Sequence, residues 1–168
     1  MNIISVDEFD GIFKTVGEQW MLIAACDKCR DGITYNAMTA SWGGMGVMWN
    51  KNVFWCFIRP QRYTKEFVDN SDKITLSFFD SKYKDALVLC GRKSGRECNK
   101  IAEAGLTVEL QNDEVFFKES EYTVVGRKLY VDTIKKDGFI DKTIVDKCYP
   151  DEDFHYVYVC EIEKILKN

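Results

Sequence analysis

The hydrophobic residues of this chain gather in short runs that are rich in β-branched and aromatic residues and bounded by turn residues. Runs of this kind are typical of strands. The last run alternates, with Tyr156, Tyr158, Cys160 and Ile162 on one face. The turn residues Asp31-Gly32 separate the first two runs. The pattern predicts strands over Trp20–Cys26, Ile33–Ser41, Val53–Ile58, Lys73–Phe79, Lys128–Ile134 and His155–Leu166.

Three short helices are expected between these strands. The first covers about Thr64–Asn70 and the second runs from Ser81 towards Cys90. A third is predicted after Ser94-Gly95-Arg96-Glu97, which matches a capping box, with Gly105 as its C-terminal glycine. Strands predominate and the helices connect them, so the expected fold is mainly β: an antiparallel barrel with short peripheral helices. A length of 168 residues predicts one domain over residues 1–168.

Composition narrows the class of protein. Apolar residues make up 46% of the chain, enough for a packed core and too many for a disordered chain. The 23 basic and 27 acidic residues show no basic cluster, which argues against a nucleic-acid partner. The longest apolar runs are far shorter than the roughly 20 residues of a membrane helix. With seven cysteines and no signal peptide at the N-terminus, we expect reduced thiols and a soluble, cytoplasmic protein.

Two nucleotide-binding motifs are rejected. Gly44–Trp49 lacks the last glycine of the dinucleotide fingerprint G-x-G-x-x-G. Gly91-Arg92-Lys93-Ser94 lacks the first glycine of a P-loop, because Ala86 stands in its place.

Three polar stretches remain as candidate binding residues. The first, Asn36–Gly44, combines an amide, two hydroxyls and an indole with glycines that let a ligand approach the backbone. Taken alone, it favours a strand end with a buried Trp and a turn. The second, Arg59–Thr64, places Arg62 and Thr64 at the start of a helix, where an anion is favoured. Taken alone, it favours a solvated arginine and a capping threonine. The third, Gly91–Lys100, is either a further anion site or a solvated basic face.

In this order and spacing, the motifs N-x-M-T-x-S-W-G-G, R-P-x-R-Y-T and S-G-R-x-x-x-K resemble the flavin reductase-like family, which includes the flavoredoxins. The closing strand from His155 to Ile162 is similar to the end of the family pattern. The resemblance covers about Asn36 to Ile162. It implies a Greek-key, antiparallel split β-barrel that binds FMN non-covalently, forms a homodimer and uses NAD(P)H as co-substrate.

By position, the resemblance also implies roles for individual residues. Cys56 and Phe57 would lie near the flavin ring, Arg62 and Thr64 would hold the phosphate, and Ser94 and Lys100 would add polar contacts. His155 would lie at the open face of the ring, as the candidate catalytic residue, or would be a strand residue that donates to a backbone carbonyl. The residues implied to line the ring and the ribityl chain are Asn36, Met38, Thr39, Ala40, Ser41 and Trp42.

One feature departs from the family pattern, namely Cys26-Asp27-Lys28-Cys29 in the first predicted hairpin. A structural zinc site needs two such pairs, and no second C-x-x-C occurs. A redox dithiol is the alternative, but the βαβ context of thioredoxin-type motifs is missing. Two unpaired thiols at a hairpin turn are the better interpretation.

The expected activity is that of an NAD(P)H-dependent, FMN-binding oxidoreductase that passes electrons through flavin to an acceptor. One alternative is a flavoredoxin-like electron carrier that takes electrons from a redox partner protein. Another is a non-catalytic split-barrel protein that binds flavin, haem or another ligand. A third, a pyridoxamine-phosphate-oxidase-like enzyme, is disfavoured by the N-x-M-T-x-S-W stretch.

Overall fold

The computed structural model describes residues 2–4, 11–32 and 34–168. Seven strands pair side by side in the order β3-β2-β6-β9-β10-β5-β4, and β1 adds to β10 as an eighth. All the pairings are antiparallel. The strands of this sheet are β1 (Asn2–Ile4), β2 (Met21–Cys26), β3 (Tyr35–Ala40), β4 (Gly43–Met48), β5 (Lys51–Ile58), β6 (Lys73–Phe79), β9 (Ser120–Thr133) and β10 (Tyr156–Lys167).

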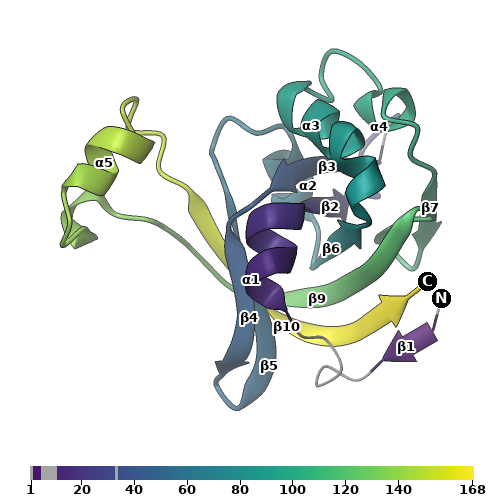
Figure 1. The fold of residues 1–168 in the computed structure, drawn as a ribbon, viewed down its shortest axis with the longest axis horizontal. Helices are drawn as coiled ribbons and strands as arrows, with labels where there is room; N and C mark the ends of the chain where they lie inside the picture. The colour runs from purple at the N-terminus through teal and green to yellow at the C-terminus, as the bar shows by residue number, and fades with distance from the viewer. Residues whose placement is uncertain (1, 5–10, 33) are drawn as a thin grey trace.

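The sheet curls into a split β-barrel with short helices around it, which confirms the predicted fold class (Figure 1). A two-stranded sheet lies beside the barrel, formed by β7 (Val108–Gln111) and β8 (Glu114–Phe117). The helices are α1 (Ile12–Lys14), η2 (Thr15–Gln19), α2 (Thr64–Asn70), η3 (Ser81–Tyr83), α3 (Lys84–Arg92), α4 (Lys100–Glu103), η4 (Lys136–Gly138) and α5 (Thr143–Cys148). None of the helices in the described part of the chain has the length and apolar character needed to cross a membrane.

Strand β2 shows why one apolar run can form the centre of this fold. All six of its residues are buried, although strand side chains alternate between two faces. Met21, Ile23 and Ala25 point into the barrel interior, where Phe54 and Tyr158 also lie. The alternate residues of β2 belong to a second cluster, formed with α3. A strand covered on both faces reads as a continuous apolar run, which is what the sequence shows.

Five of the six predicted strands and the first two helices are found within a few residues, and Lys128–Ile134 matches the second half of β9. Ile33 lies outside the described residues. The prediction omitted strand β4 (Gly43–Met48), which begins within the stretch Asn36–Gly44 that was expected to end in a turn. A Cβ atom on Gly44 would lie 2.5 Å from the Trp55 ring, so glycine lets the indole pack closely on the strand. The prediction also omitted β1, β7, β8 and the first half of β9.

The third predicted helix does not begin at Ser94. Residues 93–99 form an irregular loop, and α4 spans only four residues. The Asn99 side chain caps α4 by accepting from the Ala102 amide at 3.2 Å. Ser94 Oγ instead accepts from the Arg96 amide inside the loop. Gly105 does end this helix, with a left-handed φ of 71°.

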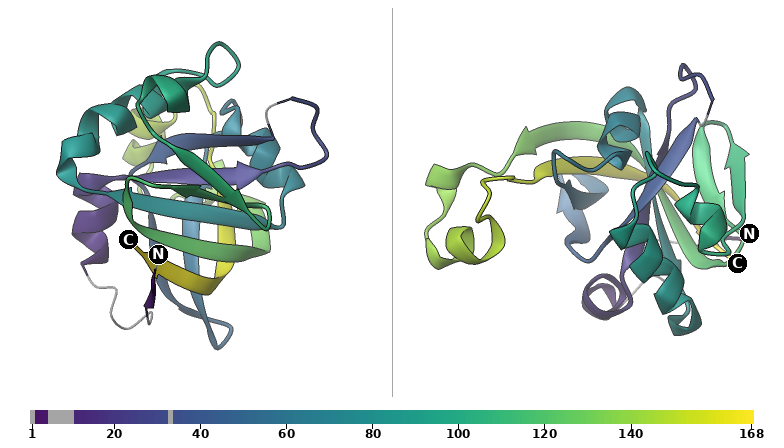
Figure 2. Two further views of the ribbon diagram at one scale, coloured as in Figure 1. Left: turned by 90° about the vertical axis from the view of Figure 1, so that its right-hand side faces the viewer. Right: turned by 90° about the horizontal axis from the view of Figure 1, so that it is seen from above.

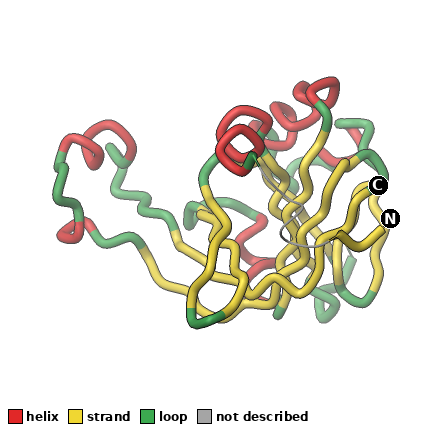
Figure 3. The backbone as a smooth tube through the Cα atoms, turned by 60° about the horizontal axis from the view of Figure 1, so that its bottom comes forward, coloured by secondary structure: helices red, strands yellow, loops and turns green. Residues whose placement is uncertain are grey.

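The connection between β9 and β10 projects from the barrel as an arm of residues 134–155 that carries η4 and α5 (Figure 2). Figure 3 shows the same arm as two loop-rich legs that leave from strand ends. The arm returns to the barrel at His155, immediately before β10. It therefore brings its last residues next to the edge formed by the ends of β3 and β5.

Candidate functional site

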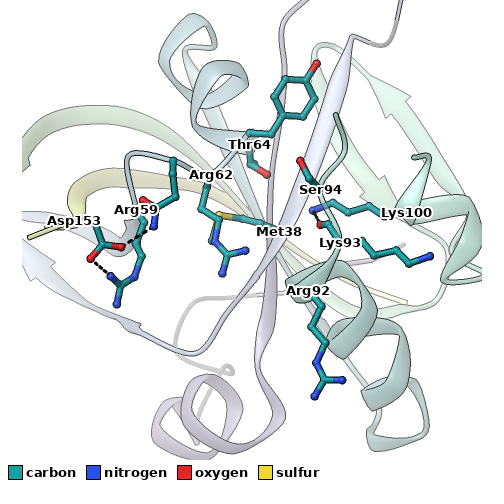
Figure 4. A pocket seen from close by; sticks show the side chains of 11 residues that line it. Met38, Arg59, Arg62, Thr64, Arg92, Lys93, Ser94, Lys100 and Asp153 are labelled. Atoms are coloured by element: carbon teal, nitrogen blue, oxygen red, sulfur yellow. Dashed lines mark hydrogen bonds and ion pairs between the residues drawn. The ribbon is translucent and has the colours of Figure 1, made fainter. Parts of the chain in front are cut away.

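A cavity of about 400 Å³ lies between the end of β5, the start of α2 and the loop after α3. We call it the cationic cavity, because five basic side chains line it and Asp153 is the one acidic residue among its lining (Figure 4). The basic residues are Arg59, Arg62, Arg92, Lys93 and Lys100. Such a surplus of positive charge favours an anionic ligand.

Arg62 and Thr64 are positioned by the turn that follows β5. Pro60 cannot donate to a neighbouring strand, so β5 ends and the chain turns into α2, which starts at Thr64 as predicted. The Arg62 guanidinium donates to the Gly91 carbonyl at 2.8 Å, which ties this turn to the end of α3. The buried Asn36 amide donates to Thr64 Oγ1 at 3.2 Å. The two side chains are thereby held at one wall of the cavity.

Lys100 and Ser94 form the opposite wall. Lys100 is only 4% exposed, and burial lowers the pKa of its ammonium group. The ammonium donates to the carbonyls of Cys90 at 2.9 Å and Lys93 at 3.2 Å, so one of its three protons stays available. The loop packs closely on β3, because a Cβ atom on Gly95 would meet Asn36 Oδ1 at 2.6 Å. Glycine at this position lets the loop carry Ser94 to the cavity.

A second cavity of about 230 Å³ adjoins the first, and we call it the aromatic cavity. It shares Met38, Arg59 and Arg62 with the cationic cavity, so the two form one continuous site. Its other lining residues are Thr39, Ala40, Ser41, Trp42, Phe57 and His155. A ligand with a charged end and a planar apolar end would find a matching surface for each.

The His155 side chain in the aromatic cavity is in contact with other aromatic residues. Its ring lies 4.9 Å from the Trp42 ring and 6.3 Å from the Phe57 ring, measured between centroids. Nδ1 is 2.9 Å from the hydroxyl of Tyr149, which comes from the arm. Burial, with a further contribution from the Arg59 charge, lowers the pKa of His155 to about 4. The imidazole is therefore neutral at pH 7, and its side-chain partner is a hydroxyl rather than the backbone carbonyl that the sequence left open.

Arg59 lines both cavities, and an acidic residue balances its charge. It forms an ion pair with Asp153 and donates to the Cys148 carbonyl at 2.9 Å. Gln61 donates to the other Asp153 oxygen at 2.6 Å. The hydrogen bond from Gln61 and the pair with Arg59 lower the pKa of Asp153, which stays ionised at neutral pH.

The structure brings most of the sequence-predicted site residues together. Those that line the two cavities are Met38, Thr39, Ala40, Ser41, Trp42, Phe57, Arg62, Thr64, Ser94, Lys100 and His155. Trp42 is 43% exposed, so the expectation of a buried Trp was wrong. Asn36 lies behind Thr64 as a support. Cys56 does not reach the cavities, because side chains alternate along β5 and that of Cys56 is fully buried in the barrel core.

Sequence reasoning missed Asp153 and Tyr149 and assigned no role to Arg59. The Arg59–Asp153 pair joins residues 94 positions apart, so no local pattern indicates it. Tyr149 belongs to the arm, whose path back to the barrel depends on tertiary structure. The one usable signal was the position of Arg59 directly after a buried strand.

The Cys26–Cys29 pair lies apart from this site. Cys26 is buried at the end of β2, Cys29 is exposed in the following turn, and all seven cysteines are free thiols. Burial raises the pKa of Cys26, which lowers its reactivity. The part of the chain that the structure describes contains no group of three His, Cys, Asp or Glu residues arranged to hold a metal ion.

Comparisons with known proteins give matches by structure and none to family models or curated sequences. Flavoredoxin from Methanosarcina acetivorans has a TM-score of 0.66 at 18% identity, over 89% of this chain and 68% of that one. An FMN-binding protein from Thermus thermophilus with bound 1-cyclohex-2-enone has a TM-score of 0.67 at 18% identity, over 95% and 75%.

A third match is an FMN-binding domain of a flavin reductases-like enzyme from Shewanella baltica. Its TM-score is 0.65 at 11% identity, over 98% of this chain and 75% of that one. At such low identity the likeness concerns the fold. The chain therefore has the split β-barrel fold that is also found in flavoredoxins and flavin reductase-like proteins.

Proposed function

We propose that this protein is an FMN-binding oxidoreductase that takes electrons from NAD(P)H. The observation that carries the proposal is the continuity of the two cavities through Met38, Arg59 and Arg62. A phosphate ester fits the cationic end, and a planar ring fits the end lined by Trp42 and Phe57. The similar structures that are described as FMN-binding proteins and flavoredoxins support the same ligand.

The donor set suits a phosphate group. Arg62 has guanidinium N–H groups beyond the one that bonds Gly91, and Lys100 retains one free proton. The hydroxyls of Thr64 and Ser94 lie on the two opposite walls. Charge-assisted hydrogen bonds from these groups would hold the phosphate. The backbone and side chains of residues 38–42 would line the ribityl chain and the ring, whereas Cys56 takes no part.

FMN, when bound, would supply the redox chemistry, and the protein would supply position and exclusion of water. In this proposal the neutral His155 and Trp42 form the surface against which a nicotinamide ring packs. Tyr149 fixes the orientation of the imidazole through Nδ1. A neutral imidazole adds no positive charge beside the ring. The homodimer and the cytoplasmic location stay predictions.

Absorption spectroscopy tests the cofactor and the donor separately. The purified protein is mixed with FMN, desalted and scanned in the visible range, and a retained flavin spectrum is expected. Anaerobic NADH or NADPH is then added to the loaded protein, and bleaching of the flavin band is expected. Retention without bleaching by either nucleotide would contradict the NAD(P)H part alone, whereas loss of FMN on desalting would contradict a resident cofactor.

A second candidate is a flavoredoxin-like electron carrier. The likeness to the flavoredoxin of Methanosarcina acetivorans favours it. In that case a reduced partner protein bleaches the bound flavin, and NADH and NADPH do not.

A further inference from the structure

A third cavity, of about 240 Å³, lies between β3 and α3, and we call it the α3 cavity. It has a mostly apolar wall with one cation at its edge: Trp20, Ala40, Leu87, Val88, Gly91 and Arg92. Thr39 and Ser41 complete its lining. Both residues and Ala40 also line the aromatic cavity, and Arg92 also lines the cationic cavity. The α3 cavity therefore adjoins the aromatic cavity along this stretch of β3.

Trp20 is held in this wall at the expense of backbone strain. It adopts a left-handed φ of 71°, which is unusual for a bulky residue. The Lys84 ammonium lies 3.2 Å from the centroid of an indole ring and donates to the Glu18 carbonyl at 2.6 Å. This cation–π contact fixes the indole. Strained residues that surrounding contacts hold in place cluster at ligand sites.

Arg92 differs from the other cations near the site. Arg59 is paired with Asp153, Lys93 with Glu103, and the ammonium of Lys100 with two carbonyls. The Arg92 guanidinium makes no hydrogen bond or ion pair with any residue that the structure describes. Figure 4 shows its side chain pointing away from Ser94 and Lys100. Its charge is therefore available to the α3 cavity, among whose lining residues there is no carboxylate.

We propose that the α3 cavity binds a small aromatic carboxylate as a second ligand. The ring would pack against Trp20, Leu87 and Val88, and the carboxylate would accept two hydrogen bonds from the Arg92 guanidinium. The volume is below the roughly 300–1,000 Å³ of pockets for larger ligands, which favours a molecule with a single ring. This inference goes beyond the proposed FMN site, because Trp20, Leu87 and Val88 line only the α3 cavity and the proposed phosphate contacts do not use Arg92, although Arg92 also lines the cationic cavity.

Isothermal titration calorimetry with benzoate tests the proposal, and benzamide serves as the uncharged probe of the same shape. One benzoate is expected per chain, in both FMN-free and FMN-loaded protein, with benzamide at least tenfold weaker. Arg92→Gln should weaken benzoate binding about tenfold and leave benzamide binding unchanged. The control Lys142→Gln, which removes an exposed cation on the arm, should change neither. Equal affinity of benzoate for the wild type and Arg92→Gln would overturn the proposal.

A second variant tests whether the ring of benzoate lies in the α3 cavity. Val88→Phe should fill the cavity and abolish benzoate binding while FMN is still retained after desalting. Unchanged benzoate binding in Val88→Phe would overturn the proposal, and so would displacement of FMN by benzoate, since the cavity would then be part of the flavin site. Failure of FMN to bind, with benzoate still bound at Arg92, would contradict the proposed function and support this site.

Discussion

The cationic and aromatic cavities share three residues and yet differ in what they offer a ligand. The cationic cavity has basic side chains on opposite walls, several with unused hydrogen-bond donors. The aromatic cavity has two aromatic rings and a neutral imidazole. Arg59 lies between them, and its charge is balanced by Asp153. Positive charge is thus concentrated at one end of a continuous site, and the other end has no charged lining residue beyond the shared Arg59 and Arg62.

In the proposed function, this difference separates binding from chemistry. Electrostatic attraction and hydrogen bonds would hold an anionic ligand at one end. A neutral surface at the other end can pack against an aromatic ring without desolvating a charge. The variants below change one end at a time, starting with the largest expected effect.

The largest effect on FMN binding is expected from loss of the Arg62 charge in the cationic cavity. Arg62→Ala should weaken FMN binding by about 2–3 kcal/mol, or roughly 30–150-fold, because charge-assisted hydrogen bonds are lost. Quenching of flavin fluorescence measures the Kd. The control Arg127→Ala removes an exposed arginine that pairs with Glu161 on the barrel, and FMN affinity should not change. Equal losses in the two variants would mean that the cationic cavity does not hold the phosphate.

The buried, neutral His155 of the aromatic cavity should make the free energy of unfolding depend on pH. The pKa of His155 is about 4 in the folded state and near 6.5 when unfolded, so the unfolded state binds more protons between these values. The free energy of unfolding therefore rises with pH between about 4 and 6.5, and it decreases as the pH falls below 6.5. At pH 5 the loss attributable to His155 is about 2 kcal/mol relative to pH 7.

Urea unfolding of the wild type, His155→Gln and Tyr149→Phe at pH 7 and pH 5 measures this contribution. His155→Gln should lose less free energy of unfolding on acidification than the wild type. Tyr149→Phe leaves the imidazole buried and should retain most of the dependence. Identical pH profiles for His155→Gln and the wild type would contradict a neutral, buried histidine.

Trp42 should contribute less, because its side chain is partly exposed. Trp42→Ala should weaken FMN binding or raise the KM for NAD(P)H by about fivefold to tenfold, which is roughly 1 kcal/mol of lost aromatic contact. Trp49→Ala is the matched control, since Trp49 is also exposed and lies in the β4–β5 turn. Steady-state kinetics of both variants measures these effects. A larger effect of Trp49→Ala than of Trp42→Ala would mean that the ligand ring does not bind beside Trp42.

The smallest effect is expected at the Cys26–Cys29 turn. Cys29→Ser replaces an exposed free thiol and should change FMN affinity and turnover less than twofold. A loss of turnover with stability unchanged would revive the redox dithiol that the sequence left as an alternative.

The sequence predicts those parts of the fold in which local chemistry decides the structure. The continuous apolar run of β2 and the start of α2 at Thr64 follow from burial and from the turn at Pro60. Strand β4 was missed because its glycines resemble a turn until Trp55 is placed against them. The capping box at Ser94 failed because Asn99 offers a better cap and the loop packs on Asn36.

The residues of the candidate site could likewise be predicted where a local motif contains them. Residues 38–42, Arg62 and Thr64 were predicted because each lies in a contiguous motif. Cys56 was misplaced because a motif match ignores which face of β5 a residue occupies. Asp153 and Tyr149 reach the cavities through the fold of the arm, and a contact across 94 residues has no local signature.

The central claim is that the cationic cavity holds the phosphate of FMN, and riboflavin, which lacks that phosphate, tests it directly. Fluorescence titration of the wild type should give at least a tenfold lower Kd for FMN than for riboflavin. In Arg62→Ala this difference should shrink to about twofold. Equal affinity of the wild type for the two flavins would contradict the account, because the charged end would then contribute nothing to binding.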